Sequence, residues 1–300
     1  MSENSKIILG ANQYGKAEVR LVKVTRDTDR HEIEDLNVTS QLRGDFAEAH
    51  LTGDNAHVVA TDTQKNTVYA LAREGVGSPE AFLLRLAEHF TSSFDWVSGG
   101  RWAAEQYSWD RIQANGIGHE HSFVRNGQEI RTAVLVVDGE NKHLIAGLKD
   151  LTVLKTTQSG FVGYPKDKYT TLAETTDRIL ATDVSARWRF NTTEVDFNKS
   201  YSDVKALLLE AFTGGYSHAL QQTLFEMGQK VLLAHPEIDE IKFSMPNKHH
   251  FLVDLSPFGL DNPNEVFFAA DRPYGLIEAT VLREDASGAG NAWDGIAGFC

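Results

Sequence analysis

The 300-residue sequence predicts an α+β protein made of two similar halves. The order strand, strand, helix, helix, strand, strand occurs twice along the chain, as a duplication of pattern and not of residue identity. Consecutive strands are joined by short turns, which favours antiparallel sheets with helices on one face. We expect a first repeat over residues 1–138, a second over 139–286 and a Gly-rich C-terminal tail over 287–300. The uncovered faces and edges of such sheets need a partner, so oligomerisation is expected.

Four strands and two helices are expected in the first repeat. The strands are expected over residues 17–27, 32–42, 101–112 and 121–137, the last as a hairpin. The hairpin follows from Asn126-Gly127, a pair that suits a two-residue turn with positive φ. The first helix is expected to begin near Asn66. The second is expected to begin at Ser78, Pro79 and Glu80, which supply an N-cap, a first-turn proline and an acidic first turn.

The second repeat has the same order of elements. Strands are expected over residues 143–156, 177–190, 239–255 and 275–283, and helices over 201–212 and 216–234. The strand over 239–255 is unusual, because "SMPNKHHFLVDL" at 244–255 places Pro246, Asn247, Lys248, His249 and His250 where apolar residues would pair. A strand that opens with such residues needs an explanation other than a core.

Composition narrows the classes of function. A formal net charge of −13 disfavours a nucleic-acid partner, because binding nucleic acid depends on Lys and Arg neutralising phosphates. No apolar run approaches the length of a membrane span, and the polar start lacks the apolar core of a signal peptide. We therefore expect a cytoplasmic protein with no membrane partner. Cys300 is the only cysteine, so no intrachain disulfide, Cys-based zinc site or iron-sulfur cluster is expected.

Two readings apply to Thr61 and Asp62, which follow the apolar strand end "VVA". They could cap the following helix, or Thr61 could be a catalytic hydroxyl. A threonine cannot take a proton by itself near neutral pH, so the second reading needs a basic partner such as a desolvated lysine. Lys16 in "QYGK" could serve, although it could equally be a solvated lysine.

The segment "QSGFVGYPKDKYTTLAETTDRIL" contains Phe161, Leu172 and Arg178. One interpretation is a loop followed by a strand with a surface arginine. A planar anionic ligand would need the same set, an aromatic ring to stack on and a guanidinium to pair with adjacent acceptors. In "YSHALQQTLFEMGQKV", Gln221 or Gln222 could add a bidentate amide.

The histidines leave a metal site open but do not define one. His119 and His121, and His249 and His250, are close in sequence, yet neighbouring strand residues can point to opposite faces and no third ligand is fixed by spacing. Capping or core histidines are the simpler interpretation. The sequence has no Gly-rich dinucleotide-binding or P-loop motif between a strand and a helix.

Seven segments together resemble the urate oxidase family, in the same order and over nearly the whole chain. They are "YGK", "ATDTQKNTVY", "HSFVRN", "GLKDLTVLKTTQSGF", "DKYTTLAETTDRILATDV", "SMPNKHHFLVDL" and "PYGLIEATV". The resemblance implies a tandem T-fold that assembles as a homotetramer, with paired sheets closed into a β-barrel tunnel. It also implies oxidation of urate by dioxygen and water to 5-hydroxyisourate and hydrogen peroxide in purine degradation, without a metal or organic cofactor.

The resemblance further implies a role for individual residues. Phe161 would stack on the purine, Arg178 and Gln221 would clamp its pyrimidine side, and the Leu220 backbone would add a contact. Asn247 would hold dioxygen or water above the ring, His249 would relay protons, and Lys16 with Thr61 would complete the relay from the neighbouring subunit. Asp62, also from that subunit, would support the loop, Leu172 would be among the substrate-binding residues, and Ile277 would help wall the pocket. The ending "GFC" differs from the peroxisomal Ser-Lys-Leu signal, which supports a bacterial-type cytoplasmic enzyme.

Two other classes remain open at this point. A zinc-dependent pterin or purine enzyme of the same fold would use the histidines as ligands. A non-catalytic purine-binding protein would bind urate without consuming oxygen.

Overall fold

The computed structural model describes residues 7–300, and the chain divides into two compact units. Of the described residues, the first unit comprises 7–126, 131–146 and 289–293, and the second comprises 127–130, 147–288 and 294–300. Both contain antiparallel strands and helices, so the predicted α+β class is confirmed. The predicted repeat boundaries at 138/139 and 286/287 stay predictions.

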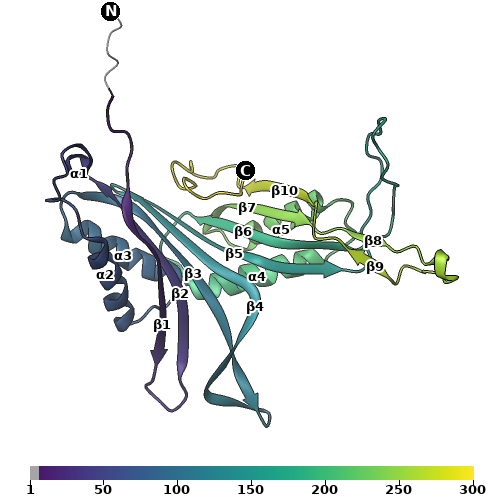
Figure 1. Cartoon of the computed structure of the whole chain (residues 1–300), viewed down its shortest axis with the longest axis horizontal. Helices are drawn as coiled ribbons and strands as arrows, with labels where there is room; N and C mark the ends of the chain where they lie inside the picture. Colours follow the sequence, from purple (N-terminus) through teal and green to yellow (C-terminus); the bar gives the residue numbers. More distant parts are fainter. Residues whose placement is uncertain (1–6) are drawn as a thin grey trace, which may run out of the picture. The chain divides into compact units, whose positions relative to one another are not determined.

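The first unit contains three helices and the first strands of the chain (Figure 1). Its elements are β1 (Tyr14–Thr25), β2 (Glu32–Gly44), α1 (Ala47–Leu51), α2 (Thr61–Glu74), α3 (Pro79–Ser93), β3 (Val97–Ala114) and β4 (Ile117–Asp138). β2 pairs antiparallel with both β1 and β3. Helix α2 packs against β1 and α3 against β3, so the two longer helices cover one face of these strands.

The second unit repeats this arrangement. Its elements are β5 (Asn141–Lys155), which begins in the first unit, β6 (Leu180–Phe190), α4 (Phe197–Thr213), α5 (Leu220–Ala234), β7 (Ile238–Asn247), β8 (His250–Leu252), the 3-10 helix η1 (Ser256–Phe258), β9 (Phe267–Ala269) and β10 (Gly275–Leu282). β7 pairs antiparallel with β6 and β10, and α5 packs against β7 and β10. The short strands β8 and β9 form a separate two-stranded arm.

The period of two along the strands builds the core of each unit. In β7, Ile241, Phe243 and Met245 are fully buried, whereas Lys242 and Ser244 between them are only partly buried. Alternate side chains of a strand point to opposite faces, so the apolar set faces one layer, and α5 covers this strand.

The predicted start of α3 is confirmed. The Ser78 hydroxyl accepts a hydrogen bond from the Ala81 N–H at 3.1 Å, and Pro79 is the first helical residue. One apolar face of this helix is fully buried, and it comprises Phe82, Leu83, Leu86 and Phe90. Serine accepts from the free N–H groups of the first turn and proline lacks an N–H to leave unpaired, which is why this start is readable from sequence.

The hairpin predicted at Asn126-Gly127 is wrong, because β4 continues through it. The turn lies instead between β3 and β4 at Asn115 and Gly116, whose φ angles of 55° and 78° suit a two-residue turn. Gly127 also has a positive φ of 68°, but it sits within the strand. The Asn126 amide donates to the Asp110 carboxylate, which lies on β3. This bond between neighbouring strands holds Asn126 within β4.

Several other boundaries differ from prediction, among them the starts of α4 and α5, which lie at Phe197 and Leu220 and not at residues 201 and 216. Helix α2 begins at Thr61, not near Asn66, and the short helix α1 precedes it. The strand expected over residues 239–255 ends at Asn247 and resumes as β8 at His250, on the two-stranded arm. None of the helices among residues 7–300 is long and apolar enough to cross a membrane.

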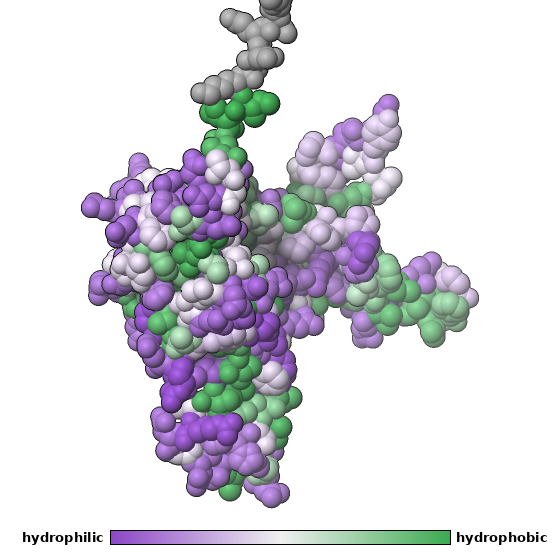
Figure 2. All heavy atoms as spheres, turned by 60° about the vertical axis from the view of Figure 1, so that its left-hand side comes forward, coloured by the Kyte–Doolittle hydropathy of each residue, from purple (hydrophilic) through white to green (hydrophobic). Residues whose placement is uncertain are grey.

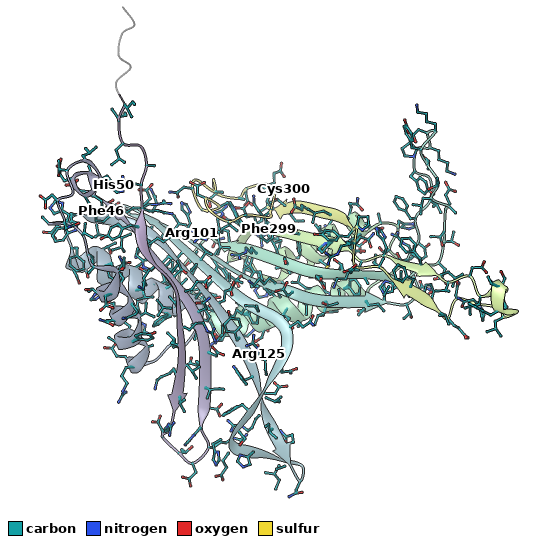
Figure 3. The ribbon with its side chains drawn as sticks, viewed as in Figure 1. Phe46, His50, Arg101, Arg125, Phe299 and Cys300 are labelled. Carbon is teal, nitrogen blue, oxygen red and sulfur yellow. The ribbon has the colours of Figure 1, made fainter. Side chains whose placement is uncertain are left out.

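The last residues of the tail lie against the second unit. The Cys300 backbone oxygen accepts from Lys242 Nζ and from Thr280 Oγ1, each at 2.9 Å. The Arg187 guanidinium lies 5.8 Å from the centre of the Phe299 ring. Figure 3 shows Phe299 and Cys300 beside β10. Three neighbouring strands therefore contact the final two residues.

Candidate active site

A cavity of about 290 Å³ in the second unit brings together five of the residues that the sequence singles out. They are Phe161, Leu172, Arg178, Asn247 and His249. The loop between β5 and β6 supplies the first three, and the segment where β7 ends supplies the other two. A larger and more open cavity of about 660 Å³, between α4 and the end of α5, contains none of the predicted residues.

Arg178 and Phe161 form the recognition side of this cavity. The Arg178 guanidinium carbon lies 5.4 Å from the centre of the Phe161 ring. Arg178 Nε donates to Ser159 Oγ at 3.2 Å, and its backbone N–H donates to the Ser159 carbonyl at 2.9 Å. Burial lowers the pKa of Arg178, although a guanidinium stays charged near neutral pH. The cavity therefore presents a cation beside an aromatic face, which suits a planar anion.

Phe161 is held by the backbone around it. Its N–H donates to the Thr175 carbonyl at 2.7 Å, and its carbonyl accepts from the Thr175 N–H at 3.1 Å. Gly160 donates to the Ser217 carbonyl at 3.0 Å, and a Cβ at Gly160 would lie 2.1 Å from the Tyr216 hydroxyl oxygen and 2.9 Å from the Thr175 carbonyl oxygen. Only glycine fits at residue 160. Phe161 is the next residue, so this close contact fixes the backbone that carries the ring.

His249 is the proton-carrying candidate in the cavity. Burial lowers the pKa of its imidazole, and the positive charges of Arg178 and His250 lower it further. A histidine whose pKa lies below the ordinary value of about 6.5 is uncharged near neutral pH. His249 can therefore accept a proton from a bound ligand.

The polar opening of "SMPNKHHFLVDL" coincides with the end of β7. Asn247 is the last residue of this strand and lies opposite Gly275 on β10 and Thr182 on β6. Lys248 leaves the ladder, donating its N–H to the Ala181 carbonyl at 2.8 Å and pairing with Asp183 at 2.6 Å. Strand pairing thus fixes Asn247 while the chain turns, and its side chain and that of His249 face the cavity instead of a core.

Leu220, Gln221 and Ile277 belong to the same unit but do not line this cavity. Leu220 is the buried first residue of α5, and Gln221 follows it on the exposed surface. The Gln222 side chain bonds to His218 and Glu226, so Gln221 is the better placed of the two amides for a ligand. Ile277 lies on β10 opposite Met245.

The segment before α5 is tied to the segment before Phe161. The Ser217 N–H donates to the Gln158 carbonyl at 2.9 Å, and its carbonyl accepts from Gly160 at 3.0 Å. The Tyr216 hydroxyl donates to the Thr176 carbonyl at 2.6 Å. These bonds hold the segment that leads into α5 near the Phe161 backbone.

Lys16, Thr61 and Asp62 are all in the first unit. Thr61 is the first residue of α2 and the N-cap is Ala60, so the Thr61 hydroxyl does not cap the helix. Asp62 accepts hydrogen bonds from Lys65 and Asn66, and these two side chains with the nearby charge of Lys16 lower its pKa. The helix-capping interpretation of Thr61 is therefore wrong, and its hydroxyl is exposed.

A buried glutamine fixes the start of α2 beside the strand that carries Lys16. Gln64 is fully buried, accepts from the Ser40 hydroxyl at 3.1 Å and donates to the Val59 carbonyl at 3.3 Å. Ser40 lies opposite Lys16 in the pairing of β2 with β1. Tyr14 on the same strand also donates to Val59 and contacts Phe46, which begins the α1 segment marked in Figure 3. The strand that carries Lys16 and the start of the helix that carries Thr61 are therefore both fixed by hydrogen bonds to the same segment around Val59.

Sequence reasoning missed several residues of the cavity wall. They include Thr175, Asp177, His250, Asn264 and Phe267. Asn264 and Phe267 come from the loop before β9 and from β9 itself, which no strand pattern predicted. His250 was identified only as a possible metal ligand. Among residues 7–300, no three His, Cys, Asp or Glu side chains are grouped so as to hold a metal ion.

The antiparallel repeats and the cavity lined by Phe161 and Arg178 place the chain among α+β enzymes of the T-fold type. A family model described as Uricase matches residues 12–136 and 144–278. The chain therefore belongs to the uricase family, that of the urate oxidases.

Individual relatives agree with this assignment. A uricase from Arthrobacter globiformis is 67% identical over 299 residues, covering 100% of this chain and 98% of that protein. A uricase from Danio rerio is 37% identical over 290 residues, covering 94% and 97%. The crystal structure of the Arthrobacter globiformis uricase superposes with a TM-score of 0.92 at 68% identity, covering 96% of this chain and 99% of that one. A Bacillus sp. TB-90 urate oxidase mutant, at 23% identity and a TM-score of 0.81, shares the fold.

Proposed function

We propose that the chain catalyses the urate oxidase reaction in the cavity around Phe161, converting urate, dioxygen and water to 5-hydroxyisourate and hydrogen peroxide. The observation that carries this proposal is that Phe161, Arg178, Asn247 and His249 line one cavity. Each group suits one need of the reaction, and the family match supports the assignment.

Recognition comes first. The urate ring stacks on Phe161, and the Arg178 guanidinium pairs with its anionic pyrimidine side. The Gln221 amide and the backbone N–H of Leu220, at the start of α5, complete this clamp. Leu172 lines the cavity, and we propose that Ile277, which lies on β10 outside that lining, also borders the bound ligand. Holding the ring in one orientation is itself part of catalysis, because the later steps need oxygen above a defined face.

Proton removal makes the electron transfer possible. Urate is an electron-rich, weakly acidic heterocycle, and loss of a second proton makes it a better one-electron donor to dioxygen. Such stepwise transfer eases the spin restriction on direct reaction with dioxygen, so no metal or organic cofactor is needed. The uncharged His249 relays protons, and Lys16 activates the Thr61 hydroxyl as its partner. Asn247 positions dioxygen, and then water, over the ring.

Each site is shared between subunits of a homotetramer. The cavity comes from one subunit, and Lys16, Thr61 and Asp62 come from its neighbour, with the sheets closed into a barrel around a tunnel. The β8–β9 arm supports assembly, since it exposes large apolar residues (Figure 2). These are Phe251, Leu252, Phe258, Leu260, Val266 and Phe268. We further propose that the enzyme works in the cytoplasm.

The decisive experiment follows urate absorbance and dissolved oxygen in one cuvette. Equimolar loss of urate and oxygen, with hydrogen peroxide formed, is the expected result. Binding of urate without oxygen uptake would instead identify a purine-binding protein. Metal analysis separates the zinc-dependent alternative, because stoichiometric zinc and loss of activity on chelation would overturn the cofactor-free mechanism.

A further inference from the structure

We propose that Tyr164 positions the substrate by supporting Phe161 from behind, so that Tyr164, Phe161 and the bound purine form a stack of three rings. The identity of the third ring rests on the proposed function.

The two protein rings are parallel neighbours. The ring centres of Phe161 and Tyr164 lie 4.8 Å apart, with an angle of 12° between their planes. Phe161 lines the cavity and Tyr164 does not. Because a ring has only two faces, Tyr164 covers the face of Phe161 that points away from the cavity. The cavity face is left for a ligand.

Tyr164 also contacts the wall of the cavity. Its hydroxyl donates to the Leu172 carbonyl at 2.6 Å, and Leu172 is a lining residue. The loop around it is closed by Glu174, which accepts from the Gly163 N–H at 3.2 Å and pairs with Lys166 at 3.2 Å. The Lys166 ammonium lies 5.6 Å from the centre of the Tyr164 ring. Tyr164 is thus fixed at its ring and at its hydroxyl.

Burial distinguishes Tyr164 from the rest of this loop. Tyr164 is half-buried, whereas Val162, Gly163 and Pro165 around it are exposed. Tyr169 in the same loop is 77% exposed and makes no ring contact with Phe161 among the described residues. A solvent-facing loop has no need of a half-buried tyrosine unless the ring supports something, and the ring it contacts is the proposed stacking surface.

The expected effect is on binding and not on chemistry. Without Tyr164, the Phe161 ring can tilt and the stacked arrangement is lost, which weakens an aromatic contact worth about a 2- to 10-fold change in affinity. No reacting atom touches Tyr164, so kcat and the pH profile should stay near those of the unsubstituted enzyme.

The test compares Tyr164→Leu, Tyr164→Phe and the matched control Tyr169→Leu. For each, KM and kcat are measured with urate, and Kd is measured by equilibrium dialysis with xanthine, a planar purine that lacks the 8-oxo group. We expect Tyr164→Leu to raise both KM and Kd about 2- to 10-fold with little change in kcat. Tyr164→Phe keeps the ring and should restore both, and Tyr169→Leu should change neither.

Two results would overturn the proposal. One is an unchanged KM and Kd in Tyr164→Leu. The other is an equal loss in Tyr164→Phe, which would assign the effect to the hydroxyl bond with Leu172. If the unsubstituted chain binds xanthine but consumes no oxygen with urate, the proposed function is wrong. The Kd values for xanthine still test the stack of Tyr164, Phe161 and the bound purine in that case. No purine binding at all would overturn both.

Discussion

The Arg178 guanidinium carbon lies 5.4 Å from the centre of the Phe161 ring, and the two side chains line the same cavity. Ser159 lies nineteen residues before Arg178 in the chain and bonds to both the backbone and the side chain of that arginine. The cation and the stacking ring are therefore held by one short stretch of backbone. In the proposed site, recognition of a planar anion depends on keeping this pair together.

Arg178→Gln should weaken urate binding by about 1.5 to 3 kcal/mol, since a hydrogen bond to a charged partner is lost in a partly buried site. Equilibrium dialysis without oxygen measures the dissociation constant directly, because urate then cannot react. Arg26→Gln, at an exposed arginine between β1 and β2, is the matched control. An unchanged dissociation constant in Arg178→Gln would remove this residue from the recognition side of the site.

Lys16→Met and Thr61→Ala should each lower kcat about a hundredfold while urate still binds, because general acid-base groups contribute roughly that much or more. Since the two act as a unit, the double variant should be little worse than either single one. Steady-state kinetics on the three variants supplies the comparison, with Lys23→Met on the same strand as control. Multiplying losses in the double variant would show that the two residues do separate jobs.

The lowered pKa of His249 predicts a pH dependence of stability. Below about 6.5, the ordinary value, this histidine binds a proton in the unfolded chain before it does so in the folded one. The unfolded state then holds more protons, so stability falls as the pH drops from about 6.5 through the folded-state pKa. The contribution is fully present above that range.

Chemical unfolding at a series of pH values tests this linkage. His249→Gln, which cannot titrate, should show a weaker loss of stability on acidification than the unsubstituted protein. His218→Gln, at an exposed histidine before α5, controls for histidine loss in general. Parallel curves for the unsubstituted protein and His249→Gln would contradict the lowered pKa.

Sites shared between subunits predict complementation. Lys16→Met and Arg178→Gln assemblies should each be nearly inactive, since every site contains one defect. If the two variants are unfolded, mixed equally and refolded, about a quarter of the sites receive intact Lys16 from one chain and intact Arg178 from another. Oxygen uptake should therefore recover to roughly a quarter of the unsubstituted activity. No recovery, with mixed assemblies confirmed by mass spectrometry, would reject the shared site.

Short sequence motifs correctly predicted those structural elements that are determined by neighbouring residues. Ser78 and Pro79 mark the start of α3 because an N-cap and a first-turn proline act on the next turn of backbone. Asn126-Gly127 carries the same kind of signal as Asn115-Gly116, yet only the second pair forms the turn. The cross-strand bond from Asn126 to Asp110 decides between them, and it depends on a register that no short segment contains.

The candidate site also combines residues that the sequence identified with residues that only the structure identified. Phe161, Arg178, Asn247 and His249 were identified through family resemblance, since each has an ordinary interpretation as a loop, surface or strand residue. Tyr164 is invisible to pattern analysis, because its importance comes from a ring that is parallel to Phe161 and not from any spacing. The start of α2 was misplaced because Gln64, a polar residue, is buried there by bonds to Ser40 and Val59. Contacts that no residue spacing specifies fixed each of these positions.

The absence of room at Gly160 limits how the proposed site of this protein can be adapted to other purines. The backbone of residue 160 is pressed against the Tyr216 hydroxyl and the Thr175 carbonyl, and it leads directly into Phe161. The Phe161 side of the cavity therefore cannot move back to admit a bulkier heterocycle or forward to contact a smaller one. A change of substrate size is expected to come from other lining residues, such as Asn264 and Phe267 on the loop and strand of the two-stranded arm. We therefore expect changes of substrate specificity in this protein to arise in cavity residues outside the Gly160–Phe161 segment.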